Sequence, residues 1–99
     1  MRLVTWNIQW GRGMDGLVDL ARIVREARAF ADFDVLCLQE VSDGCDDLDG
    51  CDGADQFAAL AALLPAYTPI AGVAYDGPGP RGRRRFGNMI LSRLPVEHV

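Results

Sequence analysis

Glu40 and Asn7 are the residues whose type and position could do chemistry. Glu40 comes shortly after the apolar residues 35–38, and Asn7 closes the apolar run that begins at Leu3. A half-buried carboxylate costs free energy unless something pairs with it, and the partners that relieve this cost are a metal ion, an arginine or backbone donors. Two apolar strands that each end in an oxygen ligand predict a binding site at their ends.

A strand over residues 2–8, a helix and a second strand over residues 34–41 must position these side chains. Apolar residues recur at three- and four-residue spacing between the strands, which predicts a helix, with Asp15 as its N-terminal cap and Arg22 on its solvated side. The second strand is apolar without alternation, which is typical of a central strand covered on both faces. This succession predicts a parallel pair of strands with a right-handed crossover.

Parallel pairing places the carboxyl ends of both strands at one edge of the sheet, where open α/β sheets bind their ligands. By the two-residue period of strands, Asn7 shares a face with Thr5, and Glu40 shares a face with Leu36 and Leu38. We consider this parity compatible with one shared site for Asn7 and Glu40.

The rest of the chain predicts a second helix and two further strands. Residues 42–54 form a loop whose aspartates we expect to be solvated, and Asp55 caps a short helix that Pro65 ends. Strands are predicted over residues 68–75 and 87–93, paired as an antiparallel hairpin around a long, mobile connection over residues 76–85.

Length and composition indicate one domain at most. The chain has 99 residues, 49% of them hydrophobic, and a net charge of −4, which gives no overall case for nucleic-acid binding. No run is long enough for a transmembrane helix, and the first strand follows Met1 so closely that a signal peptide has no room. We therefore expect a cytoplasmic protein with reduced thiols: Cys37 buried in a strand, and Cys45 and Cys51 in a loop without a function, a disulfide or a soft-metal site being the less favoured alternatives.

Three segments, 5–8, 34–41 and 87–93, together resemble the endonuclease/exonuclease/phosphatase superfamily, the group of DNase I-like nucleases. The resemblance implies an α/β fold, namely the amino-terminal part of a four-layer α/β/β/α sandwich: one mixed sheet covered by two helices. It also implies hydrolysis of phosphoester bonds with Mg²⁺ or Mn²⁺. The substrates of the superfamily include nucleic acids and other phosphoesters.

Residue by residue, the resemblance makes Asn7 and Glu40 the catalytic and metal-binding pair. We expect Asn88 to support the strand end rather than to bind metal, and we count it with Arg83, Arg84 and Arg85 as a candidate substrate-binding residue. The family's histidine in a Ser-Asp-His motif and its Asp-x-Asn pair have no counterpart in these 99 residues, and His98 stands in no matching context. We therefore expect an incomplete domain over residues 1–99 that carries part of an active site and is inactive alone.

The arginines of residues 81–85 allow a different interpretation. Arg81, Arg83, Arg84 and Arg85 form either a solvated charge run or a clamp for substrate phosphates. The alternatives to an enzyme are thus a non-catalytic module that binds phosphate or nucleic acid, and a truncated gene fragment. In either case we expect the inner face of the sheet to need the missing carboxy-terminal part or a partner to cover it.

Overall fold

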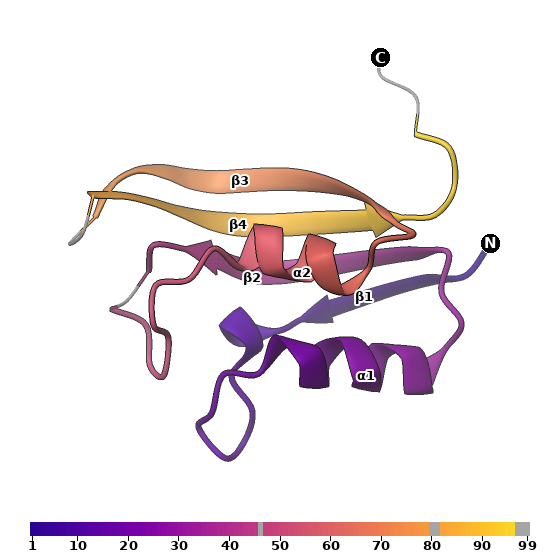
Figure 1. Ribbon diagram of the computed structural model, residues 1–99, viewed down its shortest axis with the longest axis horizontal. Helices are drawn as coiled ribbons and strands as arrows, with labels where there is room; N and C mark the ends of the chain where they lie inside the picture. The colour runs from indigo at the N-terminus through magenta and orange to yellow at the C-terminus, as the bar shows by residue number, and fades with distance from the viewer. Residues whose placement is uncertain (46, 80–81, 97–99) are drawn as a thin grey trace.

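The computed structural model describes residues 1–45, 47–79 and 82–96. Its elements follow in the order strand, short 3-10 helix, helix, strand, helix, strand, strand (Figure 1). Their bounds are β1 Leu3–Asn7, η1 Gln9–Gly11, α1 Leu20–Phe30, β2 Val35–Asp43, α2 Gln56–Leu63, β3 Thr68–Gly79 and β4 Gly82–Ser92.

The four strands form one mixed sheet in the order β1-β2-β4-β3. β1 and β2 are parallel, as the strand–helix–strand pattern predicted, and they pair in register from Leu3 opposite Val35 to Asn7 opposite Gln39. β4 runs antiparallel to both β2 and β3. The predicted mixed sheet and the antiparallel hairpin are confirmed.

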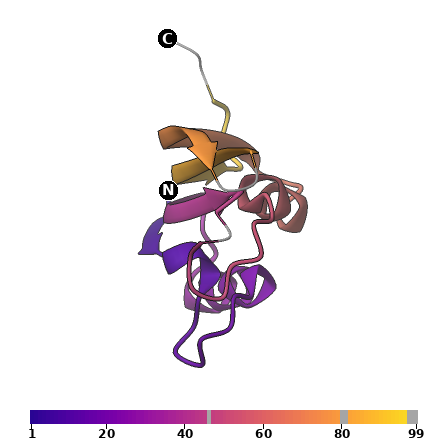
Figure 2. The same cartoon turned by 90° about the vertical axis from the view of Figure 1, so that its left-hand side faces the viewer.

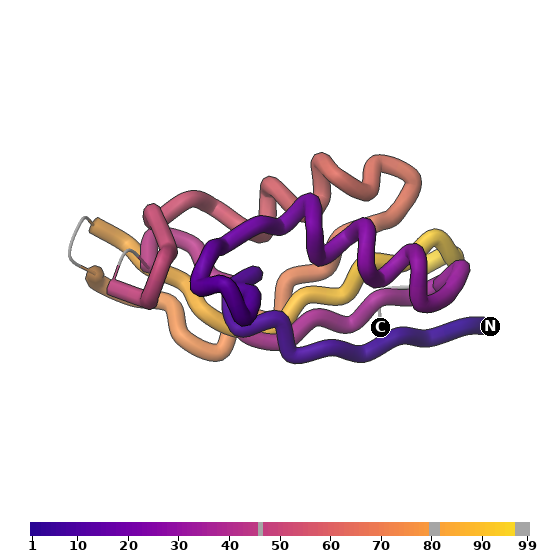
Figure 3. Tube along the Cα trace, turned by 90° about the horizontal axis from the view of Figure 1, so that it is seen from below, coloured from indigo at the N-terminus to yellow at the C-terminus, as the bar shows by residue number. Residues whose placement is uncertain are grey.

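Both helices cover the same face of the sheet, as the side and bottom views show (Figures 2 and 3). The core lies between the helices and this face, and Leu36, Leu38 and Leu91 on the sheet and Leu60 on α2 are all 0% exposed. The prediction that β2 is covered on both faces is wrong for the described residues, because no helix lies on the other face.

The uncovered face carries the alternate residues of the strands. Thr5, Cys37, Ile90 and Ile70 are register partners in one row across it. Cys37 is half-buried and Ile90 is 38% exposed, so the expectation that Cys37 is a buried core residue is wrong. We call this surface the open face.

The hairpin is longer than the sequence indicated. The predicted connection over residues 76–85 is mostly strand, because Asp76 pairs with Arg85, Gly77 with Arg84 and Pro78 with Arg83. β3 is an edge strand, where a proline without an N–H is tolerated. Residues 80 and 81, including Arg81, lie outside the described residues.

Helix α1 begins later than predicted. Its cap is Asp19, whose side chain accepts a hydrogen bond from the Arg22 N–H, and not Asp15. Asp15 instead accepts from the Leu17 N–H and forms an ion pair with Arg22 at 2.9 Å, so Arg22 is not simply solvated. For α2, the predicted cap by Asp55 is confirmed, since Asp55 accepts from the Ala58 N–H.

Candidate active site

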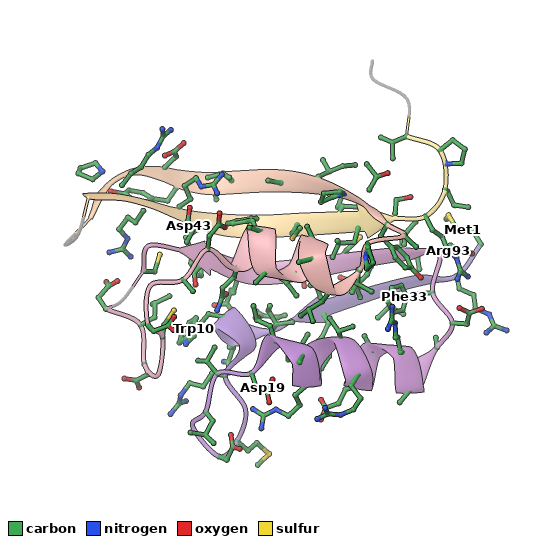
Figure 4. The ribbon with its side chains drawn as sticks, in the orientation of Figure 1. Met1, Trp10, Asp19, Phe33, Asp43 and Arg93 are labelled. Atoms are coloured by element: carbon green, nitrogen blue, oxygen red, sulfur yellow. The ribbon has the colours of Figure 1, made fainter. Side chains whose placement is uncertain are left out.

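The ends of β1 and β2 meet at one rim of the sheet. Asn7 is the last residue of β1 and lies opposite Gln39, the neighbour of Glu40, and the Ile8 N–H continues the ladder to the Gln39 carbonyl at 3.1 Å. Figure 4 labels Trp10 and Asp43 at this end of the molecule, and Met1, Phe33 and Arg93 at the other. The structure therefore brings the strand ends that carry Asn7 and Glu40 together, as parallel pairing predicted.

A β-bulge decides where Glu40 lies. Leu38 pairs with Met89 and Val41 pairs with Gly87, so Gln39 and Glu40 together oppose Asn88. Glu40 has a φ of +60°, in the left-handed region that a glutamate rarely adopts. Val41 is 0% exposed and resumes the core-facing row of Leu38.

The bulge corrects the parity argument made from the sequence. Strict alternation would continue the core-facing row of Leu36 and Leu38 at Glu40, on the face opposite Asn7, where a carboxylate would be buried among leucines. The extra residue removes Glu40 from that row and leaves it half-buried at the rim. Bulges commonly re-aim a side chain next to an active site.

Glu40 has no hydrogen-bond or ion-pair partner for its carboxylate among the residues that the structure describes. Asn7 is exposed, and its Oδ1 accepts a hydrogen bond from the Gln9 N–H at 3.1 Å. A side-chain amide oxygen has a second lone pair, and the NH₂ group supplies two donors. The rim thus offers a carboxylate, an amide oxygen and amide donors in neighbouring positions.

The chain turns sharply after Asn7. Gln9 and Trp10 both have left-handed backbone angles, with φ values of +47° and +49°. The Trp10 indole Nε1–H donates to the Asp49 carbonyl at 2.9 Å, and so ties this turn to the loop after β2. A hollow of about 720 Å³ lies beside the turn, lined by Asn7, Gln9 and Arg12 among others.

Asn88 lies across from the bulge on β4 and is exposed. Its neighbour Gly87 allows a close approach of β3, because a Cβ there would lie 2.4 Å from the Gly72 carbonyl oxygen. In the register of β2 and β4, Asn88 is the β4 residue that lies opposite Gln39 and Glu40.

The arginines of β4 are paired with acids. Arg84 Nη1 lies 2.9 Å from Asp47 Oδ2, and Arg85 Nε lies 2.9 Å from Asp43 Oδ2. The bond from Asp47 raises the pKa of Arg84, and Arg83 binds Asp76 and lowers the pKa of that carboxyl. The expectation that the loop aspartates are solvated is thus wrong for Asp43, which is half-buried at the end of β2, whereas Asp47 is exposed although it is paired.

The oxygen ligands at the rim are of the type that a divalent cation such as Mg²⁺ prefers. Mg²⁺ prefers oxygen ligands, keeps several waters and is often held by only one or two carboxylates together with substrate phosphates. Among the described residues no group of three or more His, Cys, Asp and Glu side chains is gathered for a metal. Glu40 and Asn7 could therefore supply part of an oxygen set, with water and phosphate as the remainder.

Gln56 is the residue at this rim that the sequence analysis missed. It follows the capping residue Asp55 and is 2% exposed, and its side chain contacts both the turn after β1 and the end of β2. The sequence signal for such a contact was a glutamine directly after the cap of an otherwise apolar helix. His98 lies outside the described residues.

Cys37, Cys45 and Cys51 are free thiols in the structure, and Cys45 is buried. Among the described residues no helix has the length and apolar character that crossing a membrane requires.

The comparisons with known proteins agree with this architecture. The sequence model of the Endonuclease/Exonuclease/phosphatase family matches residues 4–99. A crystal structure of an endonuclease/exonuclease/phosphatase from Beutenbergia cavernae DSM 12333 is similar, with a TM-score of 0.74 and 33% sequence identity. The similarity covers 99% of this chain and 27% of that one, and no curated protein matches the chain. The mixed sheet with its two helices is thus part of a DNase I-like fold, and the chain belongs to the Endonuclease/Exonuclease/phosphatase family.

Proposed function

We propose that this chain supplies the carboxylate and amide corner of a cation-dependent site that hydrolyses phosphoester bonds. The observation that carries the proposal is Glu40, a half-buried carboxylate on a bulge, beside the register partner of Asn7, with no partner among the described residues. Family membership supports the reaction class. Because the chain spans 27% of the B. cavernae chain, the activity of a whole protein is part of the proposal.

Mg²⁺ or Mn²⁺ is the cofactor that the donor set favours, since carboxylate and amide oxygens are hard ligands. When bound, such a cation polarises a phosphoryl oxygen and offsets the charge that develops on the leaving oxygen. Glu40 would hold the cation through its carboxylate. We assign this site the phosphoester substrate, nucleic acid included.

Asn7 would orient the phosphate or the nucleophile. The Gln9 N–H occupies one lone pair of Asn7 Oδ1 and fixes the amide, so that the NH₂ group is a donor available to a phosphate oxygen. Proton transfer from an attacking water needs a positioned base, and the described residues of this rim include no histidine. We therefore propose that further residues, together with a cover for the open face, complete the site.

The alternative, a phosphate clamp formed by the β4 arginines, has less support. Arg84 and Arg85 would have to exchange their bonds to Asp47 and Asp43 for a phosphate, and Arg85 also lies 3.6 Å from Asp55. Such a clamp would bind polyanions independently of metal and lose affinity steeply with salt.

A titration with Mn²⁺ tests the proposal. Paramagnetic broadening should appear first at the amide signals of Glu40 and its neighbours, and Glu40→Gln should weaken Mn²⁺ binding by about tenfold or more, the scale at which even outer groups around a metal act. Asp32→Asn, which removes an exposed acid at the end of the molecule opposite the rim, is the matched control and should leave Mn²⁺ binding unchanged. Equal affinity in the wild type and in Glu40→Gln would refute the metal site.

Turnover is a separate measurement. With Mg²⁺ or Mn²⁺ and a nitrophenyl phosphodiester, we expect the 99-residue chain to show no more hydrolysis than Glu40→Ala. Hydrolysis by the wild type that disappears in Glu40→Ala would show that the chain contains a complete site, and would overturn our view that it holds only part of one.

A further inference from the structure

Gln56 is a polar residue placed where only a specific contact justifies its burial. It is the first residue of α2, directly after the cap Asp55, and is 2% exposed. A buried amide is costly unless its donors and acceptors are satisfied. Phe57 and Leu60 on the same helix provide the apolar packing, so the role of Gln56 must come from its amide.

The amide of Gln56 joins the two strand ends of the rim. Its Nε2 donates to the Trp10 carbonyl at 2.8 Å, in the turn after β1. Its Oε1 accepts from the Ser42 N–H at 3.1 Å, directly beyond the bulge of β2. One buried side chain thus bonds to the backbone after Asn7 and to the backbone after Glu40.

The Ser42 N–H has no hydrogen-bond acceptor on β1. β1 pairs with β2 only as far as Gln39, so the Ser42 N–H lies beyond the last β1 partner. Ser42 is 0% exposed, and without Gln56 its N–H would be buried and unpaired. The side chain of Gln56 replaces the backbone acceptor that a longer β1 would have supplied.

The residues that this bridge encloses are conformationally strained. Gln9 and Trp10 on one side and Glu40 on the other have positive φ values. Strained conformations of this kind persist only where the surrounding structure enforces them. Gln56 bonds to Trp10 itself and to the second residue after Glu40, so it restrains both strained segments at once.

We infer that Gln56 is a positioning residue that fixes the turn after Asn7 relative to the bulge at Glu40. The inference rests on the proposed function, because it assigns Gln56 a role in that same site: holding two oxygen ligands, one from each strand end, at the spacing that a cation and a phosphate require. Gln56 itself does not touch cation or substrate in this role.

Gln56→Met tests the inference, because methionine fills a similar volume without an amide. Hydrogen exchange at Ser42, the side-chain amide signal of Asn7 and the backbone amide signal of Glu40 are measured without metal, and then Mn²⁺ is titrated. We expect faster exchange at Ser42, displaced signals of Asn7 and Glu40, and a Kd for Mn²⁺ raised by about tenfold or more, the range found for groups that orient metal ligands.

Leu60→Val is the matched control, since it weakens the core from the same helix without touching the rim. It should lower Tm yet leave the Asn7 and Glu40 signals and the Kd unchanged. The inference is overturned if Gln56→Met leaves these signals in place, or displaces them no more than Leu60→Val does.

Two further outcomes keep the inference distinct from the proposed function. If the wild type binds no Mn²⁺, the proposed function fails, while the metal-free signals still decide the role of Gln56. If Gln56→Met does not fold, hydrogen exchange of the Ser42 amide in the wild type decides. Exchange as slow as in the strand interior supports the bridge formed by Gln56. Exchange as fast as at an exposed amide overturns it.

Discussion

At the scale of single residues, the backbone of Glu40 is the most informative feature of the rim. A left-handed glutamate on a bulge costs free energy that a glycine would not, and the chain nevertheless carries a carboxylate there. Strain at such a position is commonly associated with function. Glu40 therefore offers a test that separates stability from metal binding.

Glu40→Gly should be more stable than Glu40→Ala by about 1 kcal/mol, because only alanine retains the cost of a left-handed Cβ. Both variants should lose Mn²⁺ binding, since both lack the carboxylate. The measurement is the free energy of unfolding by denaturant. Thr5 is the control: in an ordinary strand position the order should reverse, with Thr5→Ala more stable than Thr5→Gly.

At the scale of elements, the start of α1 shows how two aspartates of similar local sequence divide their roles. Asp19 caps the helix, whereas Asp15 holds the Leu17 N–H and pairs with Arg22. The pair lowers the pKa of Asp15, but exposed ion pairs contribute little to stability.

Asp19→Ala should therefore lower the free energy of unfolding by about 1 kcal/mol, the usual cost of losing an N-cap. Asp15→Ala should cost clearly less. Helical circular dichroism and denaturant unfolding of the two variants compare them directly. A larger loss for Asp15→Ala would mean that the ion pair, and not the cap, fixes the start of the helix.

At the scale of the whole molecule, a cluster of charges at the end opposite the rim joins the two halves of the sequence. Arg93, after β4, binds Asp32 at 2.9 Å and Asp34 at 2.8 Å, and Asp34 also accepts from the Arg2 N–H. The Arg2 N–H and Arg93 lower the pKa of Asp34, and Arg93 lowers the pKa of Asp32. Arginine partners lower the pKa values of Asp15 and Asp76 in the same way.

A lowered pKa in the folded state has a definite consequence for acid stability. The contribution of these carboxylates is fully present above the ordinary aspartate pKa of about 3.9, and is lost as the pH falls through the lower folded values. Tm should therefore stay level from neutral pH to about pH 5 and fall below about pH 4. Asp34→Asn should flatten this fall of Tm at acid pH in part, because Asp15, Asp32 and Asp76 still contribute.

Much of the fold follows from patterns that are local in the chain. The apolar run around Leu36 and the helical spacing before it favour a parallel pair of strands, and hence the common rim of Asn7 and Glu40. The start of α2 at its cap Asp55 and its end before Pro65 also depend only on neighbouring residues in the sequence. The family motifs add the identity of the fold, which the similar crystal structure bears out.

The tertiary structure alone decided how the rim is built. The bulge at Glu40 depends on the register of β4. Arg84 pairs with Asp47 in the loop after β2, and Gln56 bonds to Trp10 across 46 positions of sequence. Such contacts are not encoded in any local period, because they arise only when packing brings distant backbone groups together and leaves their hydrogen bonds to be satisfied. The sequence determined which strand ends meet, and the packed chain determined which side chains they present there.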